Sequence, residues 1–325
     1  MRQESETRLL TADAPAIAAA ADALRAGGLV AFPTETVYGL GADATSNAAV
    51  ARIYAAKGRP SFNPLIAHVG SLEAARREGD FNADALTLAR AFWPGPLTLV
   101  VPAAPGGRVG DLARAGLETL ALRVPAHPVA LALLAATGLP IAAPSANVSG
   151  HVSPTLASHV RADLDGRVDI ILDGGPTRVG VESTIVACLA GGPRILRAGG
   201  VTRDDIARAL GRSMAADDAV EGAVIAPGML ASHYAPRARV RLEARDVAPG
   251  EAALDFGGAL AEFPAAARID LSPFGDTEEA AARLFGALRA LDVAGVSGIA
   301  VAPVPMEGLG EAINDRLRRA AADRP

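Results

Sequence analysis

The order of apolar and amphipathic stretches constrains this chain most. Up to about residue 211, short apolar runs alternate with Ala-rich helical patterns, as expected of an α/β protein. Predicted strands lie at residues 29–32, 65–69, 97–101, 119–124, 140–143, 168–172, 184–188 and 194–196, and predicted helices at 14–26, 47–56, 83–92, 128–136 and 203–210. Because helices do not separate these strands evenly, we expect a curved mixed sheet with outer helices, not a regular doubly wound array.

A second, smaller unit follows a connector. Residues 212–236 are small and acidic at first and then rich in Pro and Gly, which is typical of an irregular linker, yet they end in the bulky pair His233 and Tyr234. Beyond them, strands near 240–242, 252–255 and 298–301 and helices at 277–291 and 310–322 predict a Rossmann-like layer arrangement. We therefore expect a first domain at 1–211, a linker or lid at 212–236 and a C-terminal domain at 237–325.

Composition excludes several classes of protein. Half of the 325 residues are hydrophobic and 21% are charged, as in a folded globular protein, and no apolar run reaches the length of a membrane span. The polar, acidic N-terminus is unlike a signal peptide, and the single cysteine, Cys188, lies in an apolar run, so we expect a cytoplasmic protein without a membrane partner. The net charge of −5 is spread over both halves and argues against a stable complex with nucleic acid.

Familiar catalytic motifs are missing from the sequence. It contains no Walker A loop and no Gly-x-Ser-x-Gly elbow, and its histidines at positions 68, 127, 151, 159 and 233 show no metal-ligand spacing. What the chain offers instead is cationic and hydroxyl donors without an obvious nucleophile. That inventory suits phosphoryl or nucleotidyl transfer, in which positioning and charge stabilisation supply most of the catalysis.

One residue stands out among the basic side chains. Of 31 lysines and arginines, Lys57 alone is a lysine, and it precedes Arg59 in a turn rich in Gly and Pro. A compact ammonium suits point-charge contact with phosphate or carboxylate, whereas arginine offers a rigid fork. The alternative is an ordinary solvated surface lysine.

Two further segments are unusually polar for connectors, and two arginines lie in strands that are otherwise apolar. Residues 33–40 follow a buried strand and could form a ligand crevice or an ordinary strand-to-helix turn. Residues 141–150 could bind an anion through backbone N–H groups or could form a plain turn. Arg123 and Arg197 lie in apolar strands and need carboxylates, which could belong to the protein or to a ligand.

Together these segments resemble the YrdC/YwlC family of L-threonylcarbamoyladenylate synthases. The resemblance rests on residues 33–40, Lys57-x-Arg59 with Pro64-Leu65, Trp93-Pro94-Gly95-Pro96, Ser145-x-Asn147 and Glu182-Ser183-Thr184-Ile185. The Pro-Gly-Met and His-Tyr-Ala-Pro segments of the linker and the Asn314-Asp315-Arg316-Leu317 ending resemble the longer, two-domain form. The family implies a YrdC-type twisted mixed sheet with a concave cleft, followed by the smaller Rossmann-like domain.

The resemblance also implies an activity. Members join L-threonine, bicarbonate or CO2, and ATP with Mg2+ into threonylcarbamoyl-AMP and pyrophosphate, and the product feeds the tRNA threonylcarbamoyl-transfer machinery. Two alternatives stay open, namely a carbamoyltransferase that forms a carbamoyl-adenylate and a non-catalytic RNA-binding module.

Carried over residue by residue, the resemblance implies two groups of site residues. Threonine would be bound by Thr36, His68, Arg123, Ala143 and Ser183. ATP would be bound by Lys57, Arg59, Asn63, Thr119, Ser145, Asn147, Ser153, Arg197, His233 and Tyr234. Lys57 and Arg59 would be the catalytic pair, with Gly228 as a candidate hinge of the lid and no metal held by protein residues.

Overall fold

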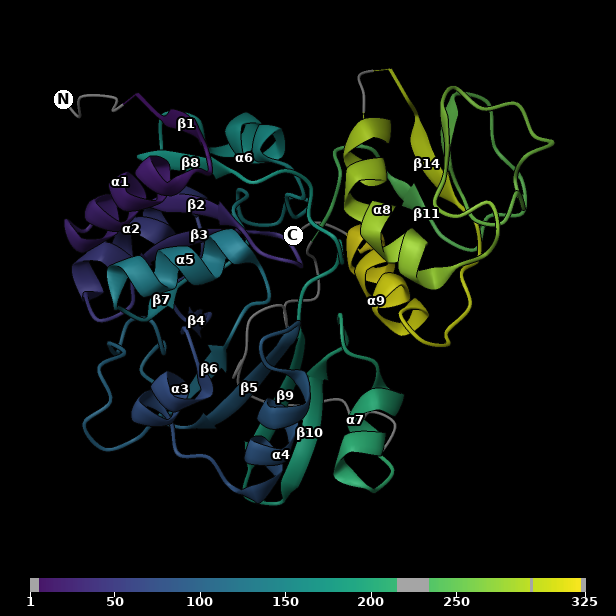
Figure 1. The fold of residues 1–325 in the computed structure, drawn as a ribbon. Coiled ribbons are helices and arrows are strands. Elements are labelled where there is room, and N and C mark those ends of the chain that lie inside the picture. Colours follow the sequence, from purple (N-terminus) through teal and green to yellow (C-terminus); the bar gives the residue numbers. More distant parts are fainter. Residues whose placement is uncertain (1–5, 215–233, 293–294, 323–325) are drawn as a thin grey trace.

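The computed structural model describes residues 6–214, 234–292 and 295–322 of the chain. Among them, two sheets account for all named strands, one in each half of the chain (Figure 1). The linker residues 215–233, which include His233 and Gly228, lie outside the described residues.

The first sheet is mixed, as the uneven spacing of its strands predicts. Within the described residues it has ten strands, in the order β1 (Arg8–Thr11), β8 (Ile170–Asp173), β2 (Val30–Pro33), β3 (Tyr38–Asp43), β7 (Ile141–Ala142), β4 (Ile66–His68), β6 (Thr119–Arg123), β5 (Leu97–Pro102), β9 (Thr184–Leu189) and β10 (Gly192–Arg197). Neighbours β4 and β6 run parallel, whereas β2 and β3 run antiparallel. The expected curved mixed sheet is confirmed.

Helices flank this sheet on its outside (Figure 1). They are α1 (Ala14–Arg25), α2 (Asn47–Lys57), α3 (Leu72–Glu78), α4 (Ala83–Phe92), α5 (Pro128–Thr137), α6 (Ala157–Leu164) and α7 (Arg203–Leu210).

The bounds of α2 determine where the single lysine lies. The Ser46 side chain caps the N-terminus of α2 by accepting from the Ala49 amide, and Gly58 ends the helix in the left-handed conformation. Lys57 is therefore the last helical residue, and the chain turns directly after it.

Residues 33–40 contradict one of the two expectations from the sequence, the strand-to-helix turn. They form a tight hairpin between β2 and β3 and not a strand-to-helix turn. The Thr34 hydroxyl donates to the Val37 carbonyl at 2.7 Å and closes the turn. β3 carries Gly39 and Gly41, which disfavour a strand by intrinsic propensity, but a Cβ at Gly41 would come within 2.8 Å of the Phe32 ring. Close packing therefore requires the glycine and overrides propensity.

The second sheet is parallel throughout the described residues. Its order is β11 (Val240–Arg241), β14 (Gly298–Val301), β12 (Glu251–Asp255) and β13 (Arg268–Asp270). α8 (Thr277–Leu291) and α9 (Gly310–Ala321) lie on the side of this sheet that faces the first sheet (Figure 1). The expected Rossmann-like arrangement is confirmed. Five elements were not predicted from the sequence, because they are too short or too rich in glycine to stand out: β13 here, and β1, β3, α3 and α6 in the first half.

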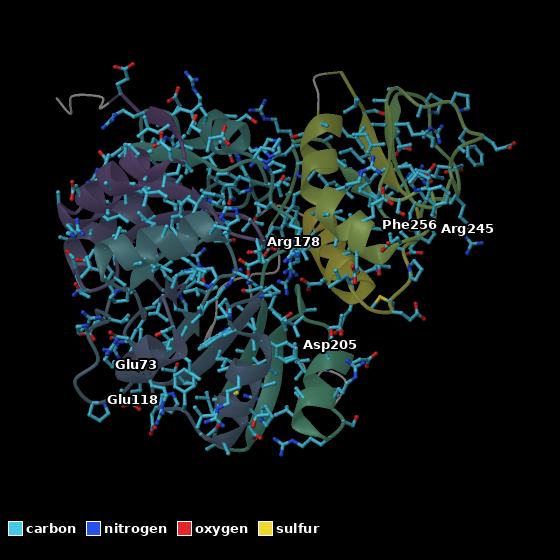
Figure 2. The ribbon with its side chains drawn as sticks, viewed as in Figure 1. Glu73, Glu118, Arg178, Asp205, Arg245 and Phe256 are labelled. Carbon is cyan, nitrogen blue, oxygen red and sulfur yellow. The ribbon has the colours of Figure 1, made fainter. Side chains whose placement is uncertain are left out.

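The two halves pack closely at one glycine. Gly180, with φ of +76°, lies so near α8 that a Cβ would fall 2.3 Å from the Ala281 carbonyl oxygen. Figure 2 shows Arg178, two residues earlier, at this junction. The approach fixes the loop before β9, which carries Glu182 and Ser183, against the C-terminal half.

The contact at Gly180 predicts a difference between two glycine substitutions. Gly166 has a similar φ of +72°, but nothing lies within 4 Å of its would-be Cβ. Gly166→Ala should lower the free energy of unfolding by about 1 kcal/mol through backbone strain alone. Gly180→Ala should lower it by about 3 kcal/mol or more, because it adds a clash with backbone. Urea denaturation measures both, and equal losses would contradict the close approach.

Candidate functional site

A pocket lies where the ends of several strands of the first sheet meet the loop before β9 and Tyr234. Its walls come from the β2–β3 hairpin, the turn after α2, the strands β4, β6 and β10, the loop after β7 and the residue Tyr234. The lining residues are Thr34, Val37, Gly39, Arg59, Ile66, His68, Arg123, Ala143, Pro144, Ser145, Glu182, Ser183, Arg197 and Tyr234. The pocket thus gathers side chains that lie up to 200 positions apart in the chain.

Three arginines line this pocket, and all three are buried. The Arg59 side chain donates to the carbonyls of Asn63 and Pro64. Burial, to which the neighbouring Arg197 guanidinium adds, lowers the pKa of Arg59 to about 10. Three positive groups so close together favour anionic ligands, because an anion relieves both their mutual repulsion and their loss of water.

Arg123 has a protein carboxylate as its partner. Its Nη2 donates to Glu35 Oε1 at 2.6 Å, and Glu35 Oε2 accepts from the Ala126 amide at 2.9 Å. Of the two sources of a carboxylate that the sequence leaves open, the structure shows the protein one. Arg123 nevertheless lines the pocket, so Glu35 also fixes the direction in which this guanidinium faces a ligand.

Arg197 is held by Ser183, which directly precedes β9, the strand next to its own. Its Nε donates to the Ser183 carbonyl at 3.2 Å, and its Nη2 donates to the same carbonyl at 2.9 Å and to the Ser183 hydroxyl at 3.2 Å. The Ser183 hydroxyl is also 2.7 Å from that of Thr98. These bonds place a hydroxyl and a guanidinium side by side in the pocket wall.

His68 contributes a neutral imidazole. It lies opposite Arg123 across the β4–β6 ladder and packs edge-on against Phe32. Burial, with Arg123 adding to it, lowers the pKa of His68 to about 3. Its Nδ1 is buried without a hydrogen-bond partner. A buried polar atom with no partner at a pocket wall is suited to a ligand's polar group.

Lys57 occupies a different position from that expected. Its ammonium is buried behind the pocket wall, where Nζ donates to the carbonyls of Ser145 at 2.6 Å and Asn147 at 2.5 Å. Burial, and after it the Arg59 charge, hold the pKa of Lys57 well below its usual range. Lys57 is not a solvated surface lysine, and it fixes the loop that carries Ser145. Direct contact with phosphate stays a prediction.

The structure brings eight predicted site residues to the pocket wall. They are His68, Arg123, Ala143 and Ser183 of the threonine group and Arg59, Ser145, Arg197 and Tyr234 of the ATP group. Within the described residues, five others lie behind the wall and bond to a lining residue or its loop: Thr36, Lys57, Asn63, Asn147 and Ser153.

Thr119 is not among the residues brought to the pocket. It begins β6, opposite Pro102, while Arg123 lies at the other end of the same strand. A strand rises by about 3.3 Å per residue, so four positions separate the two backbones by roughly 13 Å. His233 lies outside the described residues.

Three charged residues shape the site in ways that the sequence does not reveal, although Glu35 belongs to the polar run 33–40 expected at a ligand crevice. Glu35 orients Arg123, and Glu182 lines the pocket and accepts from the Ser153 hydroxyl at 2.5 Å. Arg316, from α9, donates to Glu182 Oε2 at 2.7 Å. A buried arginine signals that a carboxylate is nearby, but spacing in the sequence does not reveal which one.

The described residues contain no group of three or more His, Cys, Asp or Glu side chains that could hold a metal ion. No helix among them is both long and apolar enough to cross a bilayer.

Comparisons with known proteins give the site a context. The family model described as "Telomere recombination" matches residues 22–199, and that described as "Threonylcarbamoyl-AMP synthase, C-terminal domain" matches residues 201–322. Proteins named threonylcarbamoyl-AMP synthase from Bacillus subtilis and Pyrococcus abyssi are each 43% identical to this chain. The first covers 97% of this chain and 95% of its own length, and the second covers 94% of each.

A solved structure agrees over the same length. The crystal structure of P. abyssi Sua5 complexed with L-threonine has a TM-score of 0.88 and 40% sequence identity, covering 97% of this chain and 98% of that one. Both sheets of the present structure thus have counterparts in a protein crystallised with an amino acid.

The neutral state of His68 predicts a pH effect on stability. Its pKa is about 3 in the folded protein and 6.5 in the unfolded chain, so between these values the unfolded state binds the extra proton. Acidification from about pH 7 to about pH 5 should therefore lower the free energy of unfolding of the wild type by about 2 kcal/mol through protonation of His68 in the unfolded chain. His68→Asn should lose that much less over the same range, measured by urea denaturation at both pH values.

His159→Asn is the positive control for this measurement, because burial and Arg289 lower the pKa of His159 to about 4. An unchanged pH dependence in His68→Asn beside a reduced one in His159→Asn would contradict a buried, neutral His68.

Proposed function

This chain belongs to the threonylcarbamoyl-AMP synthase family and is a nucleotidyltransferase-type enzyme, and from that premise we propose how its pocket performs the reaction. The substrates would be L-threonine, bicarbonate or CO2, and ATP, and the products threonylcarbamoyl-AMP and pyrophosphate. The observation that carries the proposal is the buried cluster of Arg59, Arg123 and Arg197 around one pocket.

Threonine would bind beside His68 and Arg123. The threonine carboxylate would pair with the Arg123 guanidinium, whose orientation Glu35 fixes. The neutral His68 Nδ1, which has no partner in the protein, and the Ser183 hydroxyl would accept from or donate to the polar groups of the amino acid. The P. abyssi protein crystallised with L-threonine supports this choice of substrate.

ATP would lie toward Arg59, Arg197 and Tyr234. The two guanidiniums would stabilise negative charge on the phosphates, and Ser145 would approach them from the loop that Lys57 holds. Lys57 would hold that loop, its own contact with phosphate stays a prediction, and Arg59 would contact the phosphates. Asn63, Asn147 and Ser153 support the wall from behind, and the roles of Thr119 and His233 stay predictions.

The reaction would proceed without a covalent enzyme intermediate. The threonine amine attacks the carbon of CO2 and loses a proton, which gives N-carboxythreonine. An oxygen of the new carboxylate then attacks the α-phosphorus in line, the bond from that phosphorus to the bridging oxygen breaks, and pyrophosphate leaves. The pocket contributes by aligning two anions that repel each other in water.

Mg2+ is expected to accompany ATP and to neutralise part of the triphosphate charge. The pocket's donor set is mainly cationic, and the lining carboxylate, Glu182, is bonded to Arg316 and Ser153. We therefore assign no protein residue to the metal and expect phosphate oxygens to hold it.

The chain's surroundings follow from the same proposal. The product would pass to the tRNA threonylcarbamoyl-transfer machinery in the cytoplasm. The domain boundaries at 211 and 236 stay predictions, because residues 215–233 lie outside the described part of the chain. The carbamoyltransferase and RNA-binding alternatives have less support, since relatives named threonylcarbamoyl-AMP synthase match this chain over 94% of its length or more.

Pyrophosphate release from ATP tests the proposal. We expect release to require L-threonine and bicarbonate together, and release that ignores threonine would contradict the proposed reaction. In Lys57→Arg, kcat/KM should fall about 100-fold, because a bulkier guanidinium would displace the loop at Ser145 and Asn147.

Arg52→Lys is the matched control for this variant. Arg52 lies on the same helix, α2, but its side chain is 46% exposed. Wild-type turnover in Arg52→Lys and in Lys57→Arg alike would show that the single lysine is dispensable.

A further inference from the structure

An arginine of the C-terminal half reaches the wall of the pocket. Arg316 lies on α9, and its side chain is fully buried between the two halves of the chain. The proposed function gives this residue no role, and its position is more than 110 residues beyond the last pocket strand. Burying a guanidinium is costly unless each of its nitrogens finds a partner.

All three guanidinium nitrogens of Arg316 have partners. Nε donates to Glu182 Oε2 at 2.7 Å, Nη1 to Asp315 Oδ2 at 2.5 Å, and Nη2 to the Ala198 carbonyl at 2.9 Å. Glu182 precedes β9 and Ala198 follows β10. One side chain of the C-terminal half therefore bonds both to the segment before β9 and to the residue directly after the pocket arginine Arg197.

Glu182 connects Arg316 to the pocket, because it bonds to Arg316 and also lines the pocket. It is the carboxylate among the lining residues, and its second oxygen accepts from the Ser153 hydroxyl at 2.5 Å. Burial alone would raise the pKa of Glu182, but Arg316 and Arg197 together lower it below its usual range, with help from Ser153. Glu182 is thus kept as a carboxylate whose charge Arg316 balances.

Tyr234 is the second pocket residue that Arg316 contacts. The guanidinium carbon lies 5.2 Å from the centre of the Tyr234 ring, and the ring stacks on Phe285 of α8 at 5.5 Å. The backbone of Tyr234 has a φ of +63°, which is unfavourable for a residue other than glycine. Contacts with α8 and α9 therefore stabilise a strained residue that faces the pocket.

Two other ion pairs join the halves but do not reach the pocket. Arg203 of α7 pairs with Glu311 of α9, and Arg289 of α8 pairs with Asp163 of α6. None of these four residues lines the pocket, and the Arg203–Glu311 pair is partly exposed. Of the three ion pairs named here between the halves, only the Arg316–Glu182 pair includes a residue that lines the pocket.

We propose that Arg316 is a positioning residue of the synthase reaction, which balances the charge of Glu182 and holds Tyr234 so that the pocket can accept the triphosphate of ATP. This inference rests on the proposed function. Without Arg316, the Glu182 carboxylate would lack its ion-pair partner and would repel the phosphates that Arg59 and Arg197 attract, and the Tyr234 ring would lose one of its contacts. Arg123 would be little affected, because Glu35 and the Gly95 carbonyl hold it instead.

The first test compares Michaelis constants in Arg316→Met and in the wild type. We expect KM for ATP to rise about tenfold or more and KM for threonine to change less than about threefold. Glu311→Gln is the matched control, since it removes an ion pair between the same halves without touching a lining residue. It should keep both constants near their wild-type values.

The second test uses the pH dependence of activity. The charged and titratable groups that act on Glu182 are Arg316 of α9, Arg197 of β10 and Tyr234, and Asp315 shares the Arg316 guanidinium with it. Removing Arg316 raises the pKa of Glu182, so its carboxylate becomes neutral more readily as pH falls. Activity of Arg316→Met relative to wild type should therefore recover as the pH is lowered, which pH profiles of both proteins measure.

The double variant Glu182→Gln with Arg316→Met isolates the cause of that recovery. It has no carboxylate at this position, so it should show no recovery at low pH, and its KM for ATP should lie below that of Arg316→Met. A structural defect alone would affect KM for both substrates and would persist in the double variant.

Thermal unfolding identifies any variant that fails to fold. If Arg316→Met does not fold, Arg316→Lys is measured instead. It keeps the charge but loses bonds to Ala198 and Asp315, so KM for ATP should rise severalfold without a recovery at low pH.

The inference is overturned if the folded variant keeps the wild-type KM for ATP, or if Glu311→Gln raises that constant as much. Those results would leave the proposed function intact, provided that the wild type releases pyrophosphate only with threonine and bicarbonate. A wild type without that requirement would contradict the proposed function itself.

Discussion

The mutual repulsion of three buried arginines is the constraint on which the rest of the site depends. Arg59, Arg123 and Arg197 converge on one pocket, so each must be fixed by other groups before any ligand arrives. Backbone carbonyls hold Arg59 and Arg197, and the Glu35 carboxylate holds Arg123. The pocket is thus rigid, positively charged and suited to two anionic substrates that would otherwise repel each other.

The second half of the chain belongs to the same electrostatic arrangement. Glu182 offsets part of the arginine charge, but a buried carboxylate also needs a partner, and Arg316 from α9 supplies it. Gly180 allows the approach of α8 that brings this partner close. The C-terminal half is therefore more than a support for the linker, because its helices determine the charge and shape of one wall of the pocket.

The fold could be predicted from the sequence to a large extent. Apolar periodicity located α4 and α8 and the buried strands, since these elements are long or continuously apolar. It failed at β3, where close packing against Phe32 imposes glycine on a strand. The site was less predictable. The family resemblance selected residues that meet at the pocket, but it could not show that Lys57 faces two carbonyls or that Glu182 pairs with Arg316, because both facts depend on contacts across more than 85 positions.

The claim at the centre of this account is that buried arginines recognise the carboxylate of the amino acid. Isothermal titration of the full chain with L-threonine and with L-threoninol, which lacks that carboxylate, tests it most directly. L-threonine should bind about tenfold or more tightly than L-threoninol, since the charge-assisted hydrogen bond to Arg123 is lost in threoninol. Equal affinities would mean that the pocket reads the amino acid through its other groups, and the central role of the arginines would be contradicted.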